Sequence, residues 1–152
     1  MKIGPPSRWN ACPALQQRPT LGEMQTFLRA ACAVNGFLGV ALGAFGAHGL
    51  KTHLADAGDA AQRLGWWQTA SHYHLVHALA LGLLASWAAR GADRGLLLAG
   101  GAMVTGIVLF SGSLYAMTLT GQTGLGMITP LGGVAFLIGW GAVLVNAVKQ
   151  RS

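Results

Sequence analysis

Long apolar stretches alternate with short charged segments along this chain. Three stretches contain no Asp, Glu, Lys or Arg, over residues 30–50, 64–89 and 95–148, and the last of them is 54 residues long. A helix needs about 20 predominantly apolar residues to cross the core of a bilayer. The pattern therefore predicts an all-α integral membrane protein, a four-helix bundle with short loops, whose spans cover about 26–47, 70–89, 95–119 and 130–148.

The connection between the first two spans has an amphipathic pattern. Its apolar residues recur at spacings of 4, 3, 4 and 3: Leu50, Leu54, Ala57, Ala61 and Leu64. This period is typical of a helix with one apolar face, and such a helix can lie in the membrane surface. We therefore predict an interfacial helix after the first span, followed by Trp66 and Trp67 at the level of the lipid headgroups.

Composition and charge agree with a membrane protein and indicate its orientation. Only 9% of the residues are charged and 53% are hydrophobic, which does not suit a water-facing surface. The formal net charge of +6 could indicate a nucleic-acid partner. However, Lys51 and Arg63 are the only Lys or Arg residues in the first connection, and the third connection has none. The positive-inside rule then places both termini in the cytoplasm, and no nucleic-acid partner is expected.

The N-terminal segment differs from the rest of the chain. Residues 1–23 contain four prolines and no sustained periodicity, which predicts a disordered tail before a membrane domain over 24–152. We hypothesise that Met24 is the natural start of the protein. Cys12 falls in this tail and Cys32 in the first span, so no disulfide is expected between them.

Small residues form stripes along three of the predicted helices. In the first helix four glycines recur at spacings of 3, 4 and 3. The third helix has a similar row of Gly101, Thr105, Val108, Gly112 and Tyr115, and the fourth helix has one as well. Such stripes allow helices to approach closely in lipid. The glycines expected at helix contacts are Gly36, Gly39, Gly43, Gly46, Gly101, Gly112, Gly132 and Gly139.

Polar residues gather toward one end of the predicted bundle. Alternating helix directions bring the following residues to similar depths: His48, Tyr73, His77, Ser111, Ser113, Tyr115 and Thr129. Ionisable groups at membrane depth are costly and indicate a function. Two interpretations stay open: a hydrogen-bond network that fixes helix register, or a site for a metal, haem or lipid-soluble ligand built on His48 and His77. No zinc-binding motif is present, so neither a metal nor a cofactor is assigned.

Other patterns narrow the function further. Asn35 and Asn146 have similar predicted depths near the cytoplasmic end, so we expect a contact between the first and fourth helices. No nucleophile elbow, phosphate-binding loop or dinucleotide fingerprint occurs. All four acidic residues lie outside the spans, and no catalytic residue is assigned. These absences argue against an enzyme and against a transporter that uses a buried carboxylate.

Four ordered motifs resemble a known family. They are GAFGAHGL over 43–50, a segment over 73–81 that contains His77, FSGSLY over 110–115, and ITPLGG over 128–133 followed by Gly139 and Trp140. Together they resemble the YgdD-like family of small bacterial inner-membrane proteins, which is related to the animal transmembrane protein 256 family. The resemblance implies a multi-pass protein of the bacterial cytoplasmic membrane with no established activity. At His74 the chain departs from the family pattern, which tends toward an amide.

The leading functional hypothesis is therefore a structural or accessory membrane protein. Its expected surroundings are the lipid bilayer and, as a partner, either a second copy or another membrane subunit. The alternative is the ligand site near His48 and His77.

Overall fold

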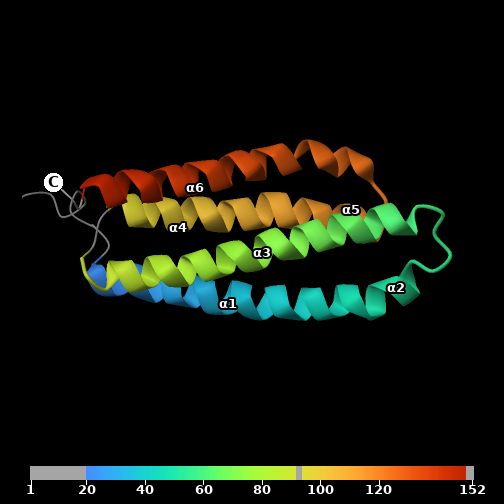
Figure 1. Ribbon diagram of the computed structural model, residues 1–152, viewed down its shortest axis with the longest axis horizontal. Helices are drawn as coiled ribbons and strands as arrows, with labels where there is room; N and C mark the ends of the chain where they lie inside the picture. Colours follow the sequence, from blue (N-terminus) through green and yellow to red (C-terminus); the bar gives the residue numbers. More distant parts are fainter. Residues whose placement is uncertain (1–19, 92–93, 150–152) are drawn as a thin grey trace, which may run out of the picture.

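The computed structural model describes residues 20–91 and 94–149, and all regular structure in these ranges is helical. The elements are α1 (Leu21–Ala47), α2 (Gly49–His53), α3 (Ala60–Ala88), α4 (Arg94–Gly106), the π turn η2 (Ile107–Ser111), α5 (Gly112–Thr120), the 3-10 turn η3 (Thr123–Met127) and α6 (Thr129–Lys149). Because α4, η2 and α5 follow each other without a break, they form one rod. Four long rods thus lie side by side (Figure 1), which confirms the predicted helical bundle.

The first helix begins earlier than the apolar pattern predicts. Thr20 and Glu23 form a capping box, in which the Thr20 hydroxyl accepts from the Glu23 N–H at 3.3 Å and the Glu23 carboxylate accepts from the Thr20 N–H at 2.7 Å. These bonds satisfy amide donors that a helix start leaves free. The helix therefore starts at Leu21 rather than near Thr26, and residues 1–19 of the predicted tail lie outside the described residues.

Within the described part of the chain, three segments are long and apolar enough to cross a membrane: Gly22–Ala47, Arg94–Thr120 and Thr123–Lys149. α3, at 29 residues, is as long as these but more polar, because it carries three histidines, Arg63 and two glutamines. It nevertheless runs along the length of the bundle between α1 and the α4 to α5 rod (Figure 1). The most polar long helix thus occupies a central position.

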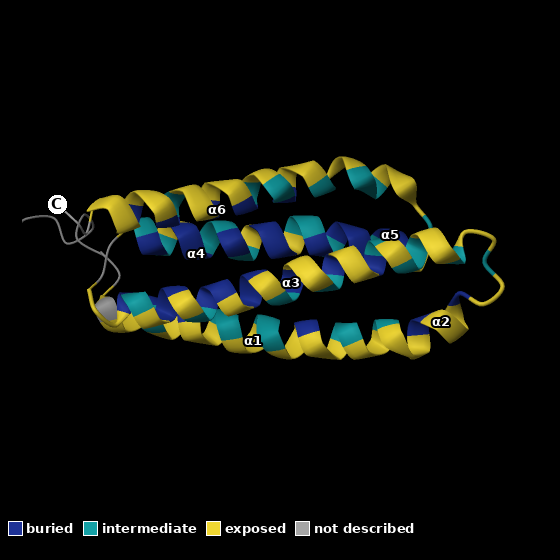
Figure 2. Ribbon diagram, viewed as in Figure 1, coloured by how far each residue is buried: buried dark blue, intermediate teal, exposed yellow. Residues whose placement is uncertain are grey.

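The four rods form two packed pairs. α1 packs on α3, and α6 packs on α4 and η2, while α3 also contacts η2 and α5. α1 and α6 lie on opposite sides of the bundle (Figure 1). Figure 2 shows that these two outer helices are largely exposed and that the inner rods hold most of the buried residues. Many exposed residues of α1 and α6 are large and apolar, among them Phe37 at 75% and Leu137 at 72% exposure, which suits a lipid environment.

A short helix follows α1, but the predicted interfacial helix over 50–64 is not continuous. α2 ends at His53, residues 54–59 form turns, and α3 begins at Ala60. Leu50 and Leu54 are buried in a cluster with Trp67 at this end of the bundle. Leu50, Leu54 and Trp67 therefore pack against protein inside the bundle, whereas Ala61 of the predicted repeat is exposed.

The predicted contact between Asn35 and Asn146 is wrong. The Asn35 amide donates within its own helix to the Ala31 carbonyl, at 2.8 Å. Because α1 starts at Leu21, Asn35 lies about 20 Å into that helix at the usual helical rise, whereas Asn146 is about one turn from the end of α6. The two helices also lie on opposite sides of the bundle (Figure 1).

Candidate functional site: the polar and aromatic interior

His77 is buried in the middle of α3, and both of its ring nitrogens face hydrogen-bond partners. Its Nδ1 lies 2.8 Å from the Tyr73 carbonyl one turn back, and the Trp140 indole N–H donates to its Nε2 at 3.3 Å. A neutral imidazole with the proton on Nδ1 satisfies both contacts. Since Trp140 belongs to α6, this histidine connects α3 to α6.

Aromatic rings surround the His77 imidazole. Phe136 of α6 stacks on it, with centroids 3.5 Å apart and 14° between the planes. Phe110 lies 4.6 Å from the Tyr73 ring and 5.7 Å from the Phe136 ring. Aromatic pairs with centroids about 4.5–7 Å apart, such as those of Phe110 with Tyr73 and with Phe136, contribute about 0.5–1.5 kcal/mol beyond their buried area. Side chains from α3, η2 and α6 thus form one aromatic cluster around a hydrogen-bonded histidine.

His74 lies one turn closer to the α2 end and has a different environment. It is buried at 4% exposure, and its Nδ1 faces the Tyr115 hydroxyl of α5 at 3.5 Å. Its Nε2 is buried with no hydrogen-bond partner among the described residues, and the same is true of the Ser111 hydroxyl. Buried polar atoms are nearly always hydrogen-bonded in native proteins, so these two atoms are exceptions.

A third polar contact joins α5 to the start of α6. The Ser113 hydroxyl donates to the Phe110 carbonyl at 2.9 Å and lies 2.8 Å from the Thr129 hydroxyl. Thr129 is the first residue of α6, and Trp140 lies about 16 Å further along the same helix. The polar contacts are therefore distributed along the bundle and do not form a single layer.

The predicted pairing of His48 with His77 is wrong. His48 is exposed at the junction of α1 and α2, at one end of the bundle. His77 lies about 25 Å into α3, counted from the start of that helix at the same end. Because both nitrogens of His77 already have partners, the interior offers no pair of histidines for a metal at this position. Within 20–91 and 94–149 no group of three or more His, Cys, Asp or Glu residues could hold a metal ion.

The predicted contact glycines occupy different environments. A methyl group added at Gly39 would come within 2.7 Å of Leu75, one at Gly43 within 3.2 Å of the Ser71 hydroxyl, and one at Gly46 would meet the Trp67 ring. Gly36 and Gly101 have nothing within 4 Å of an added methyl group, and Gly112 approaches only the carbonyl of Ile107.

Two further predicted glycines lie on α6. A methyl group added at Gly132 would meet the backbone of Phe110, and one at Gly139 would lie 3.1 Å from the Met103 side chain and 3.3 Å from the Ala99 carbonyl. Gly100 and Gly106, which the pattern did not single out, are in equally close contact with Leu28 and Phe136. Close approaches thus occur along both the α1 to α3 contact and the contact of α6 with the α4 to α5 rod.

Arg63 makes an interaction that the sequence did not suggest. Its guanidinium donates to the carbonyls of Thr118 and Leu119 at 2.7 and 3.0 Å, and the Thr118 hydroxyl donates back to the Arg63 carbonyl at 3.0 Å. These carbonyls belong to the last turn of α5, where a helix leaves acceptors free and favours a cation. Arg63 therefore joins the beginning of α3 to the end of α5.

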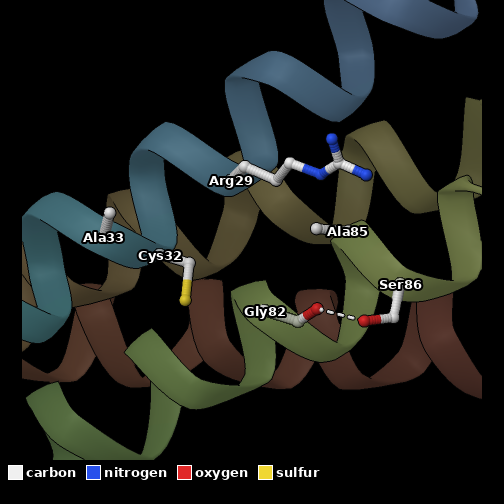
Figure 3. Close-up of a pocket in the computed structure, with 6 residues that line it drawn as sticks. All are labelled: Arg29, Cys32, Ala33, Gly82, Ala85 and Ser86. Carbon is white, nitrogen blue, oxygen red and sulfur yellow. Dashed lines mark hydrogen bonds between the residues drawn. The ribbon is translucent and has the colours of Figure 1, made fainter.

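Two grooves follow the contact between α1 and α3. One, of about 210 Å³, lies toward the end with the chain termini, where Cys32 of α1 points to Gly82 of α3 beside Arg29 (Figure 3). The hydroxyl of Ser86, which also lines this groove, donates to the Gly82 carbonyl at 3.0 Å. The second groove, of about 300 Å³, lies at the α2 end and includes Lys51 and Ser71.

The architecture defines a small multi-pass helical membrane protein, and comparisons with known proteins agree. A family model described as "Protein of unknown function (DUF423)" matches residues 42–133. Membrane protein YwdK of Bacillus subtilis is 48% identical over 118 residues, covering 77% of this chain and 92% of that protein. Inner membrane protein YgdD of Escherichia coli K12 is 39% identical over 125 residues, covering 82% and 92%. No solved structure matches.

This chain belongs to the DUF423/UPF0382 family of membrane proteins, whose function is unknown. The membership confirms the resemblance found in the four motifs, and it establishes a multi-pass protein of the bacterial membrane.

The sequence located part of this interior. It singled out His77 and Tyr115 but not their partners. Trp140, the partner of His77, belongs to another helix, and His74, the partner of Tyr115, departs from the family pattern. The signal that could have found Trp140 is the four-residue spacing of Phe136 and Trp140, which places two aromatic residues on one face of α6.

Proposed function

We propose that this protein has a structural or accessory role in the membrane, and that its interior polar residues hold the bundle in one register. The observation that supports this proposal is the environment of His77. Its two nitrogens bond to Tyr73 and Trp140, and Phe136 covers its ring. A histidine that serves as a metal or haem ligand needs a free nitrogen aimed at the ligand, and His77 offers none.

The experiment is elemental analysis and absorption spectroscopy of the gently purified protein, together with a His77→Ala variant. The proposal predicts no stoichiometric metal, no Soret band and a lower stability in the variant. A stoichiometric metal or a Soret band that is lost in His77→Ala would contradict a purely structural role. Lys51→Ala, an exposed change distant from His77, serves as the control for both readouts.

We also propose that both termini face the cytoplasm. Lys149 at the end of α6 and Arg29 near the start of α1 lie at the same end of the bundle as Arg90 and Arg94, whereas Lys51 and Arg63 lie at the other end. This asymmetry follows the positive-inside rule. Reporter fusions at Ser152 and at Gly58 test the orientation: alkaline phosphatase should be active only at Gly58. Activity at Ser152 would reverse the assignment.

A partner completes the proposed role. α1 and α6 are largely exposed (Figure 2), and many of their exposed residues are large and apolar, so either a second copy or another membrane subunit has an apolar surface to pack on. Crosslinking in native membranes, followed by mass measurement, distinguishes the two kinds of partner. A chain that stays monomeric and uncrosslinked in native membranes would contradict the accessory role.

A further inference from the structure

Two buried polar atoms have no hydrogen-bond partner among the residues that the structure describes. His74 Nε2 and Ser111 Oγ belong to residues that are 4% and 0% exposed. Ser111 and Tyr115 are four residues apart, so they lie on one face of their rod, and the Tyr115 hydroxyl faces the other nitrogen of His74. α3 is also in direct contact with η2, the turn that contains Ser111. The two atoms therefore belong to the same interior region.

The local backbone is unusual at this point. Residues 107–111 form a π turn, in which the Gly112 N–H bonds to the Ile107 carbonyl five residues back. Single π turns inside α-helices occur frequently at functional sites. Gly39 of α1 packs close to His74, because an added methyl group there would come within 3.7 Å of the His74 Cδ2 and closer still to Leu75. A small polar ligand has both donors and acceptors in this region.

The α2-end groove leads toward these residues. Ser71 lines that groove and interacts with the Tyr115 hydroxyl. It also lies three residues before His74, on the same face of α3. In space, polar side chains thus follow one another from Lys51 in the groove to Ser71, Tyr115 and His74.

We propose that His74 and Ser111 form a hydration site inside the bundle, and that water reaches it from the α2-end groove past Ser71. Water is the ligand that fits, because a buried water needs two to four polar partners and little space. Unlike His77, which is sealed by Trp140 and Phe136, His74 is thereby in exchange with the aqueous phase. The two histidines, three residues apart on one helix, differ in access to water.

Water-edited solid-state NMR of protein labelled with ¹⁵N-histidine in liposomes tests this site. Magnetisation should pass from water to the His74 ring nitrogens several-fold faster than to those of His77, which is an internal dry reference. The exposed His53 gives the fast limit, and a His74→Gln variant assigns the signal. Equal, slow transfer to both buried histidines would overturn the proposal.

Two pairs of variants locate the site and its route. Ser111→Ala should slow transfer to His74, whereas Ser86→Ala, whose hydroxyl bonds its own helix, should not. Gly43→Ala should also slow it, because the added methyl group would narrow the groove at Ser71, while Gly36→Ala faces open space and should have no effect. If Ser111→Ala leaves the rate of transfer from water to His74 unchanged, the assigned site is wrong. If Gly43→Ala leaves that rate unchanged, the proposed route is wrong. The His77 signal reports whether each variant is folded.

Discussion

The two outer helices, α1 and α6, pack on their inner neighbours in different ways. α1 lays Gly39, Gly43 and Gly46 against side chains of α3, and an added methyl group there would meet leucine, serine or tryptophan. α6 instead places Gly132 against the backbone of Phe110 and extends its aromatic side chains to His77. Each contact has one hydrogen bond between helices, from Trp67 to the Leu42 carbonyl and from Trp140 to His77. They differ in what the glycines meet: movable side chains in the α1 contact, and backbone atoms at Gly132 in the α6 contact.

The difference indicates which contact can adjust to change. In lipid, helix association depends on close packing and on hydrogen bonds between helices, because apolar burial does not distinguish protein from lipid tails. A side chain can change rotamer to accept an extra methyl group, but a backbone atom can move only with its helix. We therefore expect the α6 contact to be the less tolerant of the two.

Gly132→Ala should have the largest effect. The new methyl group would overlap the backbone of Phe110, with its Cα at 2.8 Å, so α6 must shift away from η2. We expect a loss of about 3 kcal/mol or more in the free energy of unfolding, measured by denaturant titration in mixed micelles. Gly133→Ala is the matched control, because its nearest contact is the Phe110 ring at 4.0 Å. Similar losses in Gly132→Ala and Gly133→Ala would contradict this account, because the loss could not then be attributed to the backbone of Phe110.

Gly46→Ala should have an intermediate effect on the α1 contact. The methyl group would meet the Trp67 ring, whose indole N–H donates to the Leu42 carbonyl at 2.9 Å. Moving the ring costs packing and strains this bond, for a loss of about 1–2 kcal/mol. The same titration measures it. If Gly46→Ala proved more damaging than Gly132→Ala, the α1 contact would be the rigid one.

Gly36→Ala and Gly101→Ala should have the smallest effects, and any effect should stabilise the protein. Neither position has an atom within 4 Å of an added methyl group, and alanine favours a helix over glycine by up to about 1 kcal/mol. Unfolding should therefore show no loss or a slight gain in stability. A clear loss of unfolding free energy at either position would contradict the open surroundings of these two glycines in the structure.

The apolar stretches predicted the fold to within a few residues at most helix ends. They missed the start of α1, although the Thr20 and Glu23 spacing of a capping box was readable in the sequence. They also joined residues 50–64 into one helix, because periodicity alone does not show whether an apolar face packs on lipid or on protein. The turns at 54–59 could not be located from that pattern.

The interior was harder to predict, and the π turn explains part of the error. A row from Gly101 through Val108 to Tyr115 was expected on one face, but the wider turn at 107–111 rotates the helix beyond it. As a result Val108 is 63% exposed while Tyr115 is buried. Similarly, the bond from Trp140 to His77 depends on the rotation of two helices, which a single sequence does not determine.

The central claim is that the buried interior connects α3 to α6 through His77 and Trp140. A double-mutant cycle of His77→Leu and Trp140→Phe, measured as unfolding free energies in mixed micelles, tests it directly. We predict a coupling energy of about 0.5–1.5 kcal/mol, the usual range for hydrogen bonds between membrane helices. Strictly additive effects of the two substitutions would contradict the claim, because the residues would then contribute to stability independently.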